Sequence, residues 1–93
     1  MKIGLCFPYS QDDLSRDVML EWFRRVDAGP FSAISCGERI VGSGVDMMAL
    51  LAAAAAVTTR VEIVPTLYVL PMYPAVKVAK HAATLDLISG GRT

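Results

Sequence analysis

Three short segments carry the side chains best suited to chemistry, and each lies at or directly after the end of an apolar run that is typical of a strand. They are residues 8–10 (Pro-Tyr-Ser), residues 37–39 (Gly-Glu-Arg) and residues 66–72, which begin at Thr66. Glu38 can hold a polar group of a cofactor or pair with Arg39, whose guanidinium suits a phosphate or a carboxylate. The simpler interpretation of both charges is a solvated loop.

The remaining reactive side chains are less suited to catalysis. His81 is flanked by lysines, which predicts an exposed position on a helix. Cys6 and Cys36 fall on predicted neighbouring strands, where buried free thiols behave as small apolar groups. Because there is only one histidine, a metal site is not expected. Because the two cysteines are predicted to be buried as free thiols, a disulfide framework is not expected either. Residues 42–44 (Gly-Ser-Gly) lack the third glycine of a phosphate-binding loop.

The elements that must position these segments repeat at about 30 residues, the length of one βα step. The strand-like runs are residues 2–7, 31–36 and 61–69. The helical patterns span residues 14–27, 46–58 and 74–89. The order β-α-β-α-β-α requires parallel strands with right-handed crossovers, and therefore an α/β fold. Periodicity alone leaves open whether the sheet stays open or curls into a barrel.

Local sequence signals predict the ends and the buried face of the first and third helices. Leu14, Val18, Trp22 and Val26 recur every four residues and predict its buried stripe. Asp12 or Asp13 is the expected N-cap, because a carboxylate accepts from free N–H groups of the first turn. Gly29 is expected to end the helix in the left-handed conformation. The third helix is expected to bury Val78, Ala82, Leu85 and Ile88.

Pro65 is unusual within the third strand, because proline cannot donate to a sheet ladder. Either the chain bulges between Pro65 and Tyr68, or the strand ends at Val64. Ligands of parallel α/β folds sit beyond the carboxyl ends of the strands, so all three segments are expected at one edge of the sheet. Tyr9, Tyr68 and Tyr73 can line an aromatic pocket there, although packing is the commoner use of tyrosine.

Composition narrows the class of protein further. Of 93 residues, 54% are hydrophobic and 19% are charged, which excludes a disordered tail. The zero net charge gives no basic stripe for nucleic acid or an anionic membrane. The longest apolar stretch, residues 45–57, is shorter than the roughly 20 residues that span a bilayer. The N-terminus has no signal-peptide layout, so we expect a cytoplasmic protein.

Residues 67–76 (Leu-Tyr-Val-Leu-Pro-Met-Tyr-Pro-Ala-Val) and 84–92 (Thr-Leu-Asp-Leu-Ile-Ser-Gly-Gly-Arg) carry a family resemblance. The chain resembles the bacterial luciferase-like monooxygenase superfamily, whose members share an ending of the form ALD-x-LS-x-GR before the fourth strand. Residues 2–8 and 35–39 are similar to the family's first two strand ends. The resemblance covers residues 1–93 and implies the first three βα units of a TIM (β/α)8 barrel.

The resemblance also implies a cofactor and its contacts. Family members bind FMN or the deazaflavin F420, together with a small organic substrate, at the carboxyl-end mouth of the barrel. A bulge in strand three, often with a non-proline cis peptide, supports the flavin ring and falls on Thr66, Leu67 and Tyr68. The family's acidic-His pair falls on Glu38 and Arg39, where arginine replaces the usual histidine. Tyr73-Pro74 likewise stands in place of a frequent His-Pro.

Three parallel strands leave two unpaired sheet edges, so we expect an incomplete barrel that does not catalyse alone or bind FMN tightly. The alternative is a non-enzymatic module that self-assembles through its open edges into a homo-oligomer. A third interpretation is a small open sheet of the flavodoxin type, although no phosphate loop follows its first strand.

Overall fold

The computed structural model describes residues 1–93 as a three-stranded sheet with three α-helices, which confirms the predicted βα repeat. The strands are β1 (Gly4–Cys6), β2 (Ala33–Gly37) and β3 (Glu62–Leu67). The helices are α1 (Arg16–Ala28), α2 (Met47–Val57) and α3 (Ala75–Ser89), with a 3-10 turn η1 (Leu70–Met72) before α3. No helix is long and apolar enough to cross a membrane.

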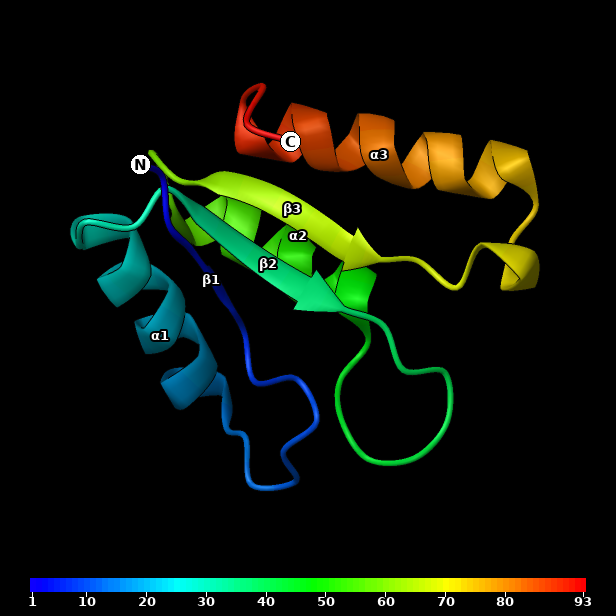
Figure 1. Cartoon of the computed structure of the whole chain (residues 1–93), viewed down its shortest axis with the longest axis horizontal. Helices are drawn as coiled ribbons and strands as arrows, with labels where there is room; N and C mark the ends of the chain where they lie inside the picture. The colour runs from blue at the N-terminus through cyan, green and yellow to red at the C-terminus, as the bar shows by residue number, and fades with distance from the viewer.

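The sheet has the strand order β1-β2-β3, and both strand pairs are parallel (Figure 1). The flavodoxin interpretation is therefore wrong, because that fold places β1 between β2 and β3. Helix α2 packs against both α1 and α3 as well as against β2 and β3. All three helices thus cover the same side of the sheet, which is the arrangement of a barrel wall.

The two faces of the sheet differ in what covers them. Leu5, Ile34 and Ile63 are register partners across the three strands, and Ile34 and Ile63 are fully buried against the helices. Because side chains alternate along a strand, the adjacent row of Cys6, Ser35 and Val64 points to the other face. No helix covers that face, which corresponds to the interior of a barrel.

A β-bulge interrupts β3 at its carboxyl end. Cys36 pairs with Pro65, but the next residue, Gly37, pairs with Leu67, so Thr66 is the extra residue. The predicted bulge is confirmed, and the strand does not end at Val64. All peptide bonds, including those of the bulge, are trans.

The position of Pro65 follows from the direction of the backbone donors. The Glu62 N–H donates to Ser32 O on the β2 side, whereas the Ile63 N–H donates to Arg92 O on the outer side. Successive residues alternate in direction, so the nitrogen of Pro65 faces outward like that of Ile63. The missing N–H therefore removes no bond between β2 and β3.

Helix α1 differs from its prediction in three ways. Its N-cap is Ser15, whose Oγ accepts from Val18 N, so neither Asp12 nor Asp13 caps it. Gly29 ends the helix in an extended rather than a left-handed conformation. The buried side chains are Phe23 and Val26, whereas Val18 is 57% exposed. Met19, Leu20 and Phe23 widen the apolar face of the helix beyond the predicted stripe. The centre of this wider face packs against the core, so Val18 lies at its exposed edge.

Helix α2 follows its prediction closely. Asp46 is the N-cap and accepts from Ala49 N at 2.9 Å, and Thr58 is the C-cap. Ala54 and Ala55 are fully buried against the sheet, because their short side chains allow the helix to lie close to it. The helix therefore lies at the centre of the helical layer.

The residues after α3 contact the end of α2 and the start of β3. Gly90 ends the helix in the left-handed conformation, with φ at 67°. Arg92 then lies beside β3, where a fourth strand is expected, and its carbonyl accepts from Ile63 N at 2.8 Å. Its guanidinium donates to Ala55 O, Thr58 O, Thr58 Oγ1 and Val61 O at 2.7–3.0 Å. Arg92 thus joins α3, the end of α2 and the start of β3.

The predicted buried face of α3 is only partly correct. Leu85 and Ser89 are buried, whereas Ala82 is exposed and Ile88 is 43% exposed. The helix packs mainly against α2, so only a narrow line of its residues is covered.

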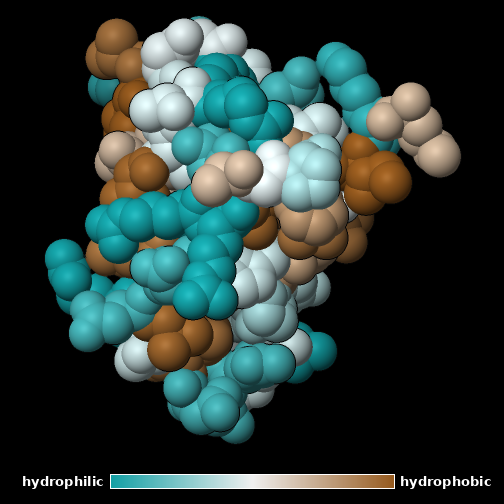
Figure 2. All heavy atoms as spheres, turned by 90° about the vertical axis from the view of Figure 1, so that its left-hand side faces the viewer, coloured by the Kyte–Doolittle hydropathy of each residue, from teal (hydrophilic) through white to brown (hydrophobic).

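Exposed apolar side chains are distributed over several elements rather than gathered in one area. Figure 2 shows the side of the molecule that carries α1, where polar groups predominate and apolar areas lie between them. The large exposed apolar side chains include Ile3, Ile40, Val41, Leu67, Leu70, Met72, Val76 and Leu87. Several of them lie at the carboxyl ends of β2 and β3 or in the segment that follows β3.

Asp27 is the main polar link between α1 and the segment after α2. Its carboxylate accepts from the backbone N–H groups of Thr59, Arg60 and Val61 at 2.9–3.0 Å. Partial burial raises the pKa of Asp27, but these backbone donors and the Thr59 hydroxyl outweigh it, so the pKa lies below its ordinary value. The ionised carboxylate is therefore favoured in the folded chain.

This lowered pKa predicts acid sensitivity. Since the folded pKa lies below the unfolded one, the stabilisation is present above the unfolded pKa and is lost as pH falls through the folded pKa. We expect the urea midpoint to fall between about pH 5 and pH 2, and Asp27→Asn to flatten that fall. Urea unfolding followed by circular dichroism at several pH values measures both. Equal pH dependence in the two chains would exclude Asp27 as the source.

Candidate functional site

The carboxyl ends of the strands gather the three segments that were predicted to carry chemistry. The loops after β1 and β2 meet there, because Val45 N donates to Tyr9 O and Ser43 Oγ donates to Ser10 O. The ends of β2 and β3 lie side by side at the same edge (Figure 1). The candidate site therefore lies at the mouth of the barrel wall.

The bulge determines which side chains reach this mouth. Leu67 is paired with Gly37, so it points to the helix-free face, where it is 65% exposed. Tyr68 consequently points to the helical side, where its hydroxyl donates to Met48 Sδ of α2 at 2.7 Å. If Thr66 paired with Gly37 in regular register instead of bulging, these two side chains would exchange faces.

Glu38 connects the end of β2 to the segment after β3. Its Oε1 accepts from Val69 N at 2.7 Å, and its Oε2 accepts from the Tyr73 hydroxyl. The predicted alternative pairing with Arg39 does not form, since Glu38 takes part in no ion pair. Both carboxylate oxygens are instead occupied by the chain itself.

The tyrosines of the third segment form an aromatic cluster around this carboxylate. The rings of Tyr68 and Tyr73 meet edge to face with centroids 5.9 Å apart. The hydrogen bond to Glu38, with smaller effects of desolvation and nearby negative charge, raises the pKa of Tyr73 to about 12. Burial, followed by the charges of Glu38 and Asp46, raises the pKa of Tyr68. Both phenols therefore stay protonated at neutral pH.

Arg39 is not brought into this cluster. It is exposed and makes no hydrogen bond or ion pair with another residue. It lines a hollow of about 310 Å³ beyond β2 together with Glu38, Tyr73 and the loop before α2. Its guanidinium is free to meet an anionic group, but nothing in the chain orients it.

Two glycines allow the close approach of loops at the mouth. A Cβ at Gly37 would lie 2.8 Å from the Tyr9 hydroxyl, so Tyr9 packs over β2 where a side chain is missing. Gly44 has φ at +120°, and a Cβ there would lie 2.5 Å from Tyr9 O. Tyr9 is thus separated from the other two tyrosines and covers the end of β2.

The two cysteines differ in their environments. Cys36 is fully buried, and burial raises the pKa of its thiol to about 12, so it is not a nucleophile at neutral pH. Cys6 was expected to be buried but is exposed, because β1 is an edge strand and Cys6 points to the helix-free face. Both cysteines are free thiols.

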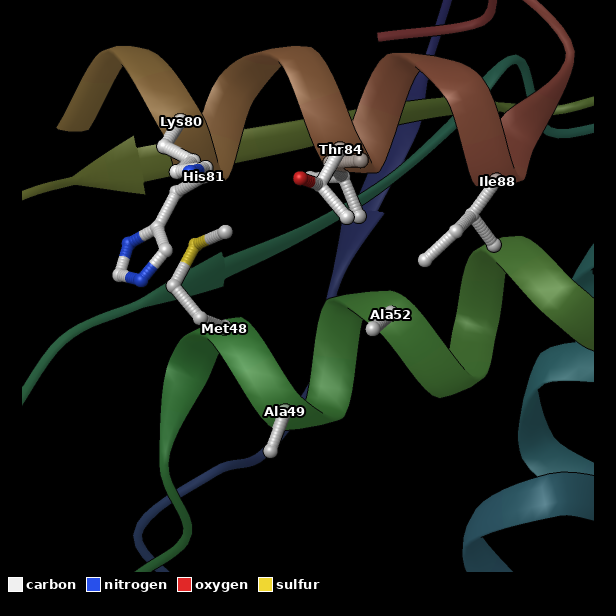
Figure 3. A pocket seen from close by; sticks show the side chains of 8 residues that line it. Met48, Ala49, Ala52, Lys80, His81, Thr84 and Ile88 are labelled. Carbon is white, nitrogen blue, oxygen red and sulfur yellow. The ribbon is translucent and has the colours of Figure 1, made fainter. Parts of the chain in front are cut away.

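His81 was expected to be exposed, but it faces α2. It lines a groove of about 270 Å³ between α2 and α3, where its ring lies near Met48 (Figure 3). Its Nδ1 is buried without a hydrogen-bond partner, and its ring meets that of Tyr73 with centroids 6.1 Å apart. The groove lies on the helical side of the sheet, so it is separate from the helix-free face.

Comparison with protein families identifies this arrangement. The family model described as luciferase-like monooxygenase matches residues 1–93. The chain belongs to the luciferase-like monooxygenase family. The resemblance that was read from residues 67–76 and 84–92 is confirmed. A search of curated protein sequences gave no match.

Solved structures of luciferase-like proteins share the fold. The oxygenating constituent of 3,6-diketocamphane monooxygenase from Pseudomonas putida, in complex with FMN, matches with a TM-score of 0.82 and 25% identity. Monooxygenase RslO1 from Streptomyces bottropensis matches with a TM-score of 0.82 and 28% identity. The coenzyme F420 dependent tetrahydromethanopterin reductase from Methanopyrus kandleri matches with a TM-score of 0.77 and 22% identity, which shows the fold alone.

The matches also give the extent of the shared region. They cover 98–99% of this chain but only 24–31% of the three neighbours. The neighbours are TIM-barrel proteins, so the chain corresponds to part of a barrel wall. The predicted fold class, a partial TIM barrel of three βα units, is confirmed.

Proposed function

We propose that this chain forms the flavin-supporting wall of a luciferase-like oxidoreductase, with FMN or F420 held at the bulge of β3. The observation that carries the proposal is the extra residue Thr66, which turns Leu67 onto the helix-free face at the carboxyl end of the sheet. In the whole protein, reduced flavin would pass electrons to oxygen and an organic substrate. With F420 as the cofactor, a hydride would instead be exchanged between F420 and the substrate.

The residues present fit a flat, largely apolar ring with a polar rim. Leu67 offers an exposed apolar surface beside Gly37, over which the Tyr9 side chain packs. Glu38 is tied to Val69 N and Tyr73, so no free carboxylate opposes the ring. Thr66 and Tyr68 are the chain neighbours of Leu67, with the Tyr68 ring on the helical side, and Arg39 is the cation available to an anionic part of a ligand.

The chain's own contribution is binding and orientation. The bulge fixes the backbone next to the ligand, and the Glu38 bonds hold the following segment in place. Neither Cys36 nor the two bonded tyrosines is in a protonation state suited to nucleophilic attack at neutral pH. The activity and the substrate of the whole protein are therefore assigned to the cofactor and to residues of the rest of the barrel.

A titration of the isotope-labelled chain with FMN, followed by amide NMR shifts, tests the proposal. We expect weak, saturable binding with a dissociation constant of about 1 mM, because a partial wall buries little of the ligand. The amides of Thr66, Leu67 and Glu38 should shift most, and those of α1 should stay in place. Uniform small shifts, or shifts confined to the groove between α2 and α3, would refute the flavin site.

The alternative function is a self-assembling module, and the free outer edge of β1 is the observation that favours it. Sedimentation at several concentrations separates the two. Discrete closed oligomers would favour the module, whereas a concentration-independent monomer would leave the flavin-supporting wall as the better account.

A further inference from the structure

The contacts of Tyr73 assign it a role that the flavin site alone does not require. Tyr73 lies between η1 and α3, outside the bulge, yet its hydroxyl reaches Glu38 at the end of β2. Its ring is held on two sides, since it meets Tyr68 at 5.9 Å and His81 at 6.1 Å, both edge to face. The direction of the hydroxyl is therefore fixed by packing.

We propose that Tyr73 is a positioning residue that holds the Glu38 carboxylate, so that the segment after β3 stays tied to the end of β2 beside the bulge. This inference rests on the proposed flavin site for its functional meaning. Tyr73 touches no reacting atom in this account and acts only through Glu38.

The geometry of the carboxylate supports this role. Glu38 has two anchors on different oxygens, the Val69 N–H on Oε1 at 2.7 Å and the Tyr73 hydroxyl on Oε2. A carboxylate held at one oxygen can still rotate about its terminal torsion, whereas one held at both cannot. Hydrogen bonds to an ionised acceptor are also the stronger kind. The second anchor thus restricts both Glu38 and the Val69 amide.

The same contact gives Tyr73 a measurable signature. The groups that act on its phenol are Glu38, Asp46 and Tyr68, with the His81 ring adjacent, and the Glu38 hydrogen bond has the largest effect on its pKa. That pKa of about 12 should fall toward the ordinary value in Glu38→Gln, which removes the negative acceptor.

Three measurements on the 93-residue chain test the role of Tyr73. The difference in alkaline ultraviolet titration between wild type and Tyr73→Phe should give a phenol pKa of about 12, lower in Glu38→Gln. Tyr73→Phe should speed hydrogen exchange of the Val69 amide about tenfold, consistent with losing one charged hydrogen bond. It should also raise the FMN dissociation constant about fivefold.

The matched control is Tyr68→Phe, which removes a hydroxyl from the same aromatic cluster but one that bonds Met48 Sδ. It should leave Val69 exchange unchanged. Equal Val69 exchange in wild type and Tyr73→Phe, or unfolding of Tyr73→Phe despite its retained ring, would overturn the positioning role. If wild type does not bind FMN but Tyr73→Phe still speeds Val69 amide exchange, the flavin site is wrong and the role of Tyr73 in holding Glu38 remains.

Discussion

Arg92→Ala is expected to destabilise the chain by about 3 kcal/mol, because it leaves several carbonyls without a charged donor. The guanidinium bonds Ala55 O, Thr58 O, Val61 O and Ser89 O, all at 2.6–3.0 Å. These acceptors belong to the end of α2, the start of β3 and the end of α3. One side chain therefore fixes three elements relative to one another.

Urea unfolding measures this effect, and the midpoint should fall by roughly 2 M at the unfolding slope of a small domain. Arg92→Lys should recover less than half of the loss, since an ammonium cannot match the planar fork of the guanidinium. Arg24→Ala is the control, because Arg24 is an exposed residue of α1 with no hydrogen bond or ion pair. If the Arg92 and Arg24 variants unfold alike, the network contributes nothing measurable.

Deletion of Thr66 is expected to abolish FMN binding, with at least a tenfold rise in the dissociation constant, while the fold is retained. The deletion joins Pro65 to Leu67, so the ladder continues from Cys36 to Gly37 in regular register. Leu67 keeps the helix-free face and Tyr68 keeps the helical side, because the alternation is preserved. Only the outward displacement of the backbone at the bulge is lost.

The control for this deletion is Thr66→Ala, which keeps the extra residue and should lose much less FMN affinity than the deletion. The amide NMR titration reports binding, and urea unfolding should place the deletion within about 1 kcal/mol of wild type. Retained FMN affinity in the deletion variant would show that the bulge is not the support. If the deletion variant is folded but has lost its affinity for FMN, the bulge geometry itself is required for binding.

Local sequence signals predicted the elements whose determinants lie within a few residues. Asp46 and Thr58 bound α2 as expected, since a carboxylate cap and an alanine run leave little choice of register. The bulge was one of two alternatives for Pro65, and the structure decides for it. The family ending at residues 84–92 identified the barrel fold, which periodicity alone did not distinguish from an open sheet.

The errors at the N-cap of α1 and at His81 have different local causes. Ser15 lies only two positions after Asp13, and either side chain can cap a helix, so the capping preference alone did not distinguish them. His81 lies beside lysines in the sequence, but the turn of the helix places it toward α2.

The polar networks could not be predicted because their partners are far apart in sequence. The bonds of Asp27, Glu38 and Arg92 mostly link residues more than 30 positions apart. No spacing rule connects such positions before the fold is known. Glu38 was selected from its place at a strand end and Tyr73 as a candidate pocket residue, but the hydrogen bond between them was not predicted.

Nuclear Overhauser effects between FMN and the labelled chain test the flavin site most directly. If FMN binds at the bulge, its ring protons should contact the methyl groups of Leu67 and Thr66. Contacts to the methyl groups of Met48 and Ile88 instead would place the ligand in the groove between α2 and α3 and contradict the account.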